Sequence, residues 1–299
     1  MKTYNEKERF CELTFQNCMP CWHAYTCGKD TPILFANDND MSFAMNVIAQ
    51  AAYQFINKVR IIAFEVMNNH FHFVISGDKG YADDMFNLLF RRIRRALSSS
   101  NTLSVSYKPI EDLTSMRNHI VYVHRNGYVV NPCYTPFSYP WGTGPCYFSP
   151  ERTGKLFSEI LSADNRQMFR SRDVKLPSVW KVINGYVSPE SFCSIDTGMA
   201  MFRDAHQYFS AVSKNVEAYS GIAVELDEGE FLTDQELFPK ILQTLREKYN
   251  VSTIRELTNS QRLDLARSLH FDFRSSNGQI RRVLGLSQFD IDSLFPKSH

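Results

Sequence analysis

The chain has no apolar run that approaches the length of a membrane span. A transmembrane helix needs about 20 consecutive apolar residues, and no such stretch occurs in the 299 residues. The first ten residues, MKTYNEKERF, also lack the apolar core of a signal peptide. These two absences predict a protein of the cytoplasm without a membrane partner.

A strong charge imbalance is missing as well. The chain has 33 Lys and Arg against 32 Asp and Glu, a net charge of +1, so any surface that binds a polyanion must be local. The odd number of cysteines, seven, argues against a complete disulfide framework. Cys18 and Cys21 have zinc-knuckle spacing, but no second C-x-x-C follows, which favours an ordinary apolar role for these thiols.

The first half of the chain alternates strand and helix patterns. Asn68-Asn69 favours a tight turn between two neighbouring strands, so the sheet is expected to be at least partly antiparallel. Pro109 has no backbone N–H to donate, so its strand is not expected to be a central strand over its whole length. Strands are expected over residues 22–26, 59–66, 70–75 and 103–110, and helices over 41–57, 82–98 and 112–126, the last ending at Gly127.

Long amphipathic patterns replace this alternation after residue 150, where we place a domain boundary. Residues 151–299 are expected to form a mostly helical accessory domain, with a helix-turn-helix near 260–295. Gly285 falls where the turn needs a glycine, and Ser287 can cap the next helix. Acidic residues on that helix disfavour contact with DNA phosphates, so DNA reading by this domain stays open.

Two histidines share one face of the strand over residues 70–75. Side chains alternate across a strand, so His70 and His72 point to one side while Phe71 and Phe73 point to the other. Buried imidazoles are costly unless something needs them, and a divalent metal is a common need. The alternative is a pair of core histidines with ordinary hydrogen bonds.

The helix over 112–126 offers a nucleophile. Tyr122 and Asn126 are four residues apart on one helix face, and His119 lies one turn earlier on it. Tyr122 can also be an ordinary tyrosine of an amphipathic helix. Tyr128 and Tyr134 are rival nucleophiles, disfavoured because neither shares a face with Asn126.

A basic cluster lies on the helix over 82–98. It is either a solvated helix face or a track for backbone phosphates, and the track is favoured if the histidines and Tyr122 form a candidate site for phosphodiester cleavage nearby. Its members are Arg91, Arg92, Arg94 and Arg95.

Taken in order, these motifs resemble the single-tyrosine HUH-type transposases, especially the REP-associated tyrosine transposases. Residues 69–73 (Asn-His-Phe-His-Phe) are similar to the family's metal motif, with Asn68 in place of a proline. Residues 122–127 and 139–143 are similar to its nucleophile motif, Tyr-Ile-x-x-Asn-Pro followed by Tyr-x-Trp-Ser-Ser. Gly127 replaces the proline and Gly142 the first serine. The resemblance covers about residues 20 to 148.

The resemblance implies an α+β fold in residues 1–150, a ferredoxin-like antiparallel sheet with helices on one face. It implies a metal-dependent endonuclease and strand transferase that acts on single-stranded or hairpin DNA through a 5′-phosphotyrosine on Tyr122. His70, His72 and Asn126 would hold Mg²⁺ or Mn²⁺, which suit a mixed nitrogen and oxygen ligand set, although zinc is not excluded.

The resemblance leaves other points open. His119 can serve as a base, as a phosphate contact or as neither. The relatives include monomers and also dimers that share active sites, so a homodimer is neither required nor excluded. The departures from the motifs keep an alternative function in view, a domesticated, non-catalytic nucleic-acid-binding protein that retains the transposase fold.

Overall fold

The computed structural model describes residues 3–28, 33–97, 103–130, 134–171, 174–214, 222, 226, 234–271, 273, 275 and 277–294. They form two compact units. The first holds the described residues up to Lys214 except Val129 and Val130, and the second holds those two and the described residues from Ile222 onward. The chain therefore divides after residue 214 instead of residue 150. Long-range bonds explain the difference, because the Asn46 amide donates to the carbonyls of Met168 and Gly185.

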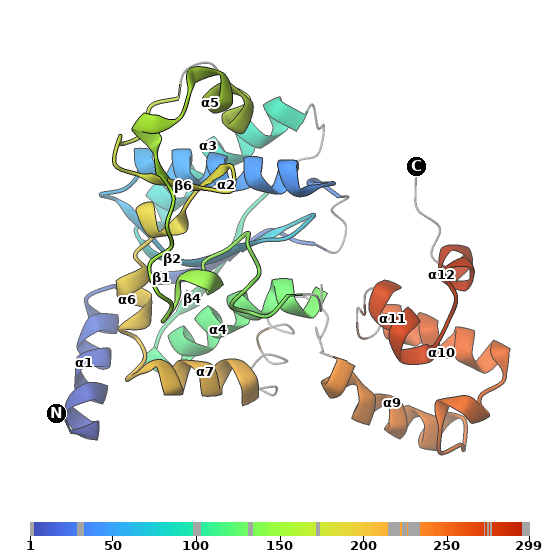
Figure 1. Ribbon diagram of the computed structural model, residues 1–299. Coiled ribbons are helices and arrows are strands. Elements are labelled where there is room, and N and C mark those ends of the chain that lie inside the picture. Colours follow the sequence, from blue (N-terminus) through green and yellow to red (C-terminus); the bar gives the residue numbers. More distant parts are fainter. Residues whose placement is uncertain are drawn as a thin grey trace. The chain divides into compact units, whose positions relative to one another are not determined.

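A four-stranded antiparallel sheet forms the centre of the first unit (Figure 1). The strands lie in the order β2-β3-β1-β4. The hairpin expected at Asn68-Asn69 is present, and its turn is closed by the Met67 amide, which donates to the His70 carbonyl at 2.8 Å. Pro109 lies in an edge strand, where its missing N–H does no harm. The strands are β1 (Cys21–Tyr25), β2 (Val59–Val66), β3 (Phe71–Gly77) and β4 (Ser106–Ile110).

Helices cover both faces of this sheet (Figure 1). The rings of Phe86 and Phe90 pack on Phe73 and Phe71, with centroids 5.1 and 6.4 Å apart, so α3 lies on the phenylalanine face. Helix α4 covers the opposite face, which carries the histidines. The expectation of helices on one face is therefore wrong, because both faces of β3 carry buried side chains that need a covering layer. The helices are α2 (Asp38–Gln54), α3 (Lys79–Leu97) and α4 (Leu113–Val130).

From the sequence, α4 was expected to end at Gly127, but the helix continues to Val130. A Cβ at Gly127 would lie 2.4 Å from ring atoms of Tyr139. The glycine therefore allows a close approach of that ring to the helix instead of ending the helix. In this position the Tyr139 hydroxyl donates to the Val66 carbonyl at 2.7 Å.

Several small elements complete the first unit. The N-terminal helix was not expected from the sequence; Thr3 and Glu6 cap it reciprocally, and its buried residues are Cys11 and Phe15. A small antiparallel sheet in the segment after residue 150 was not expected either. The elements are α1 (Tyr4–Gln16), β5 (Lys155–Leu156), α5 (Ser162–Phe169), β6 (Lys181–Ile183), β7 (Tyr186–Val187), α6 (Ile195–Met199) and α7 (Ala205–Lys214).

The second unit is helical in its described part. Its helices pack around buried residues that include Leu245, Leu269 and Ile291. Gly285 has a φ of 64° between the last two helices, and Ser287 accepts from the Asp290 amide at 3.2 Å, as a turn and cap require. DNA reading by this unit stays a prediction. The helices are α9 (Asp234–Lys248), α10 (Asn259–Phe271), α11 (Asn277–Leu284) and α12 (Gln288–Leu294).

None of the helices in the described part of the chain is both long enough and apolar enough to cross a membrane.

Candidate functional site

The strand register gathers polar side chains on the sheet face under α4. His72 pairs with Tyr25 of β1 on one side and with Glu65 of β2 on the other. Cross-strand partners point to the same face, and so does His23, two residues before Tyr25. His70 directly precedes β3, and its ring centroid lies 5.0 Å from that of His72. The structure therefore brings the two imidazoles together, as their alternation along the strand predicts.

The candidate residues His119 and Tyr122 of helix α4 pack against these histidines. The Nδ1 atoms of His119 and His23 are 2.8 Å apart. One turn later, the ring of Tyr122 stands edge-on to His23 and His72, with centroid distances of 5.9 and 5.7 Å. The candidate nucleophile thus lies directly against one of the candidate ligands.

Asn126 follows on the same helix face, one turn beyond Tyr122. The next backbone amide, that of Gly127, donates to Glu65 Oε2 at 2.8 Å. Because Glu65 is the strand partner of His72, this bond brings the Asn126 turn toward the same part of the sheet. The Nδ2 atom of Asn126 is buried and has no hydrogen-bond partner. A buried donor left in this state typically costs about 1–3 kcal/mol, which a bound ligand with an acceptor would offset.

A third buried histidine, His23, holds the site together. Its Nε2 lies 3.1 Å from Nδ1 of His72, so a chain of hydrogen bonds runs from His119 through His23 to His72. Burial, followed by the neighbouring imidazoles, lowers the pKa of His23 well below its ordinary range, so the ring is neutral. Sequence reasoning missed His23. Its alternation with Tyr25 on β1 was the available signal, but the partner strand was not known.

Each candidate ligand histidine has its ring plane fixed by a neighbour. His72 Nδ1 meets His23, and His70 Nδ1 lies 2.7 Å from the Asn69 side-chain oxygen. Asn69 is itself held, because its Nδ2 donates to the Gly28 carbonyl at 2.9 Å. With Nδ1 engaged in both rings, Nε2 is the nitrogen that each would offer to a metal, an arrangement common around metal-binding histidines.

A metal centre at His70 and His72 stays a prediction that needs a third ligand. Within the described ranges, no three His, Cys, Asp or Glu side chains form a group that could hold a metal ion. A site here therefore needs a ligand of another kind, and α4 supplies the Asn126 amide. The 5.0 Å between the rings of His70 and His72 is compatible with two imidazoles on one metal at about 2.1 Å.

The site is closed to solvent in this structure. Tyr122 is 3% exposed and His72 is 0% exposed, and the other members are similarly buried. A DNA strand therefore cannot reach the Tyr122 hydroxyl in this conformation.

The arginine cluster lies elsewhere. Arg91, Arg92, Arg94 and Arg95 are on α3, whose Phe86 and Phe90 pack on the opposite face of the sheet from the histidines. The arginines thus do not flank the candidate site, contrary to the expectation that placed them beside it. A helix that connects two strands of a sheet covers only one face of that sheet. Here α3 covers one face, and the histidines lie on the opposite face.

The remaining candidates of α4 and its neighbourhood have other partners. His124 has partners away from Tyr122: its Nδ1 lies 2.8 Å from the Tyr208 hydroxyl and its Nε2 2.8 Å from Thr143 Oγ1. Tyr134, a rival nucleophile, packs edge-on to Tyr139 with centroids 5.5 Å apart. The side chain of Tyr128 lies outside the described residues.

The segment over residues 139–143 has a structural role. Its backbone pairs with β2, since the Val66 amide donates to the Trp141 carbonyl and the Thr143 amide to the Phe64 carbonyl, both at 2.9 Å. A Cβ at Gly142 would lie 2.5 Å from Glu65 Cγ, so a glycine lets the segment approach the sheet. This motif therefore covers the edge of β2 next to the site.

Comparisons with known proteins add little. No protein-family model matches the chain, and no curated protein matches it. A solved structure of a REP-associated tyrosine transposase bound to a REP hairpin is similar over 42% of this chain and 76% of that chain, with 14% sequence identity and a TM-score of 0.34. A likeness this weak does not establish a shared fold or function.

Proposed function

We propose that this protein cleaves and rejoins single-stranded or hairpin DNA through a covalent 5′-phosphotyrosine on Tyr122, with His70, His72 and Asn126 as ligands of Mg²⁺ or Mn²⁺. The observation that carries the proposal is the position of the Tyr122 ring, 5.7 Å from the ring of His72. Nucleophile and candidate ligand are thereby neighbours in one layer between α4 and the sheet.

The sheet topology supports the proposal. The chain order β1-α2-β2-β3-α3-β4 and the strand order β2-β3-β1-β4 support a ferredoxin-like arrangement of two interleaved β-α-β units. In such an arrangement the two crossover helices cover one face of the sheet. The other face remains for the histidines and α4, which is where the proposed chemistry lies.

In the proposed reaction the Tyr122 hydroxyl oxygen attacks the phosphorus of a phosphodiester. The bond from phosphorus to the 3′ oxygen breaks, the 5′ phosphate stays on the tyrosine, and the 3′ hydroxyl leaves with a proton. Attack by another 3′ hydroxyl reverses the step and rejoins the strand, so the bond energy is conserved. A bound divalent ion would polarise a non-bridging phosphate oxygen.

The phenol needs help at neutral pH, since a free tyrosine has a pKa near 10. His119, one turn before Tyr122 and hydrogen-bonded to His23, is the imidazole on the same helix face that can take the phenol proton. His23 then couples His119 to His72 through its second ring nitrogen. The chain of imidazoles would keep the base and the ligand in a fixed relation.

A second candidate function is a non-catalytic nucleic-acid-binding protein that retains the transposase fold. The burial of Tyr122, 3% exposed, favours it. Catalysis requires an opening that exposes the hydroxyl, whereas binding elsewhere on the surface does not. The two candidates differ in whether a covalent adduct forms.

The test is to incubate the protein with labelled single-stranded and hairpin oligonucleotides and Mn²⁺, then to look for a covalent adduct on a denaturing gel. We expect the wild-type protein and Tyr134→Phe to form the adduct, and Tyr122→Phe and His70→Ala to fold normally without forming it. No adduct from the wild-type protein on any substrate would favour the binding protein. An adduct that persists in Tyr122→Phe would assign the nucleophile to another tyrosine.

A further inference from the structure

Three of the α3 arginines line a hollow on the outer side of the helix. Residues 88, 91, 92 and 95 share one helix face, opposite the face of Phe86 and Phe90 that packs on the sheet. The hollow has a volume of about 840 Å³, and α2 and the end of α5 supply its other walls. We call it the arginine hollow; its charged lining residues are Arg91, Arg92, Arg95 and Arg170.

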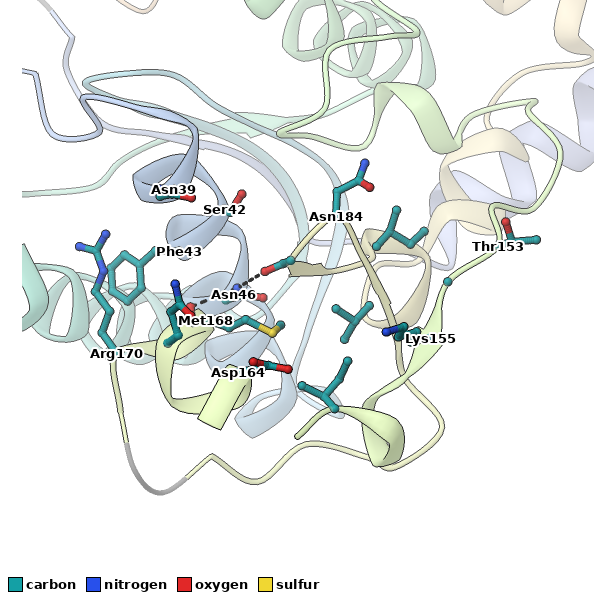
Figure 2. Close-up of a pocket in the computed structure, with 16 residues that line it drawn as sticks. Asn39, Ser42, Phe43, Asn46, Thr153, Lys155, Asp164, Met168, Arg170 and Asn184 are labelled. Carbon is teal, nitrogen blue, oxygen red and sulfur yellow. Dashed lines mark hydrogen bonds between the residues drawn. The ribbon is translucent and has the colours of Figure 1, made fainter. Parts of the chain in front are cut away.

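The arginine hollow carries an excess of positive charge. None of its described lining residues is an aspartate or glutamate. Arg170 forms an ion pair with Asp40, outside the lining, and its guanidinium lies 4.5 Å from the centre of the Phe43 ring (Figure 2). Arg170 is thus held in place and partly neutralised, whereas no ion pair joins the three α3 arginines to another described residue. The hollow therefore favours an anionic ligand.

Arg92 gives a more specific indication. Its Nη1 donates to Gln50 Oε1 at 2.6 Å, but its Nε is buried and has no hydrogen-bond partner. Burial, followed by the charge of Arg91, lowers the pKa of Arg92. A phosphate in the hollow would supply negative charge beside the three α3 arginines, and a guanidinium matches phosphate geometry.

A neighbouring cavity of about 920 Å³, between α2, α5 and the small sheet, carries no comparable indication (Figure 2). Its buried amide, Asn46, is already satisfied: it donates to Met168 and Gly185 and accepts from the Val187 amide at 2.8 Å. Those bonds hold α2 to the segment after residue 150.

We propose that the arginine hollow binds a phosphate group, and that this phosphate belongs to a part of the nucleic acid that is not being cleaved. The hollow and the histidines lie on opposite sides of α3 and the sheet, so at least one helix diameter, about 10 Å, separates them. The hollow is thus an anchoring site, outside the reach of the Tyr122 hydroxyl. Phosphate binding itself does not depend on the proposed function, but the assignment to DNA rests on it.

The test compares Arg91→Gln/Arg95→Gln with Arg94→Gln. Arg94 is the matched control, because it is exposed on the same helix but does not line the hollow. Binding of a labelled hairpin and of a single strand is measured by fluorescence anisotropy at several salt concentrations, in a Tyr122→Phe background without Mn²⁺. We expect the double variant to bind about tenfold more weakly, with a salt slope smaller by about 1.4 on single strands. Arg94→Gln should change affinity less than about twofold.

A second measurement separates DNA from a small phosphorylated ligand. Inorganic phosphate and pyrophosphate, at constant ionic strength, should raise the melting temperature of the parent protein and not that of the double variant. If phosphate or pyrophosphate stabilises the parent protein but the double variant binds DNA as tightly as the parent, the assignment to DNA is wrong. The absence of both effects would overturn the phosphate site. Neither result depends on adduct formation, so a failure here is distinct from a failure of the proposed catalysis.

Discussion

The pH dependence of stability tests how α4 is held in place. His124 is completely buried, and it bonds to Tyr208 of α7 and to Thr143 of the segment that covers β2. Burial lowers the pKa of His124 to about 3. This imidazole therefore ties the helix of Tyr122 to two other parts of the first unit, and burial disfavours its charged form.

The sign and size of the effect follow from linkage. An unfolded histidine has a pKa of about 6.5, so between pH 6.5 and pH 3 the unfolded chain binds a proton that the folded chain does not. Stability is therefore lost as the pH falls through this window. Each pH unit below 6.5 lowers the free energy of unfolding by about 1.4 kcal/mol, which gives about 2 kcal/mol at pH 5.

The assay is urea unfolding of the wild-type protein and His124→Gln at pH 7 and pH 5. The variant loses hydrogen bonds at both pH values, but it has no imidazole to titrate. We expect the stability difference, wild type minus variant, to be about 2 kcal/mol smaller at pH 5 than at pH 7. His206→Gln, at an exposed position of α7, should show no such change. An equal difference at both pH values would refute the claim that folding keeps His124 neutral.

Two further predictions concern the neighbours of Tyr122. Gly127→Ala should lower the free energy of unfolding by about 1–3 kcal/mol, because the new Cβ would meet the Tyr139 ring at 2.4 Å; an unchanged urea midpoint would contradict that packing. On the proposed function, His23→Leu should weaken Mn²⁺ binding by about 10–100-fold, because His72 loses the partner that fixes its ring. Calorimetric titration measures this, and wild-type affinity in the variant would remove His23 from the site.

The central sheet could be predicted from the sequence because its signals are local. β2 (Val59–Val66) matches its expected bounds, since a run of β-branched and aromatic residues ends at the Asn68-Asn69 turn. The small sheet could not be found in this way, because strands of two or three residues, such as Lys155–Leu156, are too short to show a period. Its contacts with α2 kept residues 151–214 in the first unit, and no composition change marks the true division.

The position of the arginines was mispredicted for a different reason. Periodicity shows that α3 has an apolar stripe, but it does not show which face of the sheet that stripe covers. The right-handed path of a crossover between parallel strands decides this, and β3 and β4 are parallel because each pairs antiparallel with β1. Phe86 and Phe90 consequently meet Phe73 and Phe71, on the side away from His72.

His23 could not be found without the strand pairing. Its bond to His72 joins residues 49 positions apart, and that contact exists only because β1 lies beside β3. Alternation along the strand and spacing along the helix were enough to predict two groupings. These are His70 with His72, and Tyr122 one turn after His119. The chain of hydrogen bonds that orients these side chains could not be predicted from the sequence.

The buried polar layer gives an argument for the proposed enzyme, to be weighed against the burial of Tyr122. A layer of imidazoles with an unpartnered Asn126 nitrogen and an unpartnered Glu65 Oε1 is less stable than an apolar layer of the same shape. A protein that binds nucleic acid only through its outer surface gains nothing from this layer. A protein that must place a phenol beside metal ligands gains their fixed geometry, and it then has to expose Tyr122 by local opening. Tyr122 is 3% exposed in the closed conformation, so adduct formation decides whether the opening occurs.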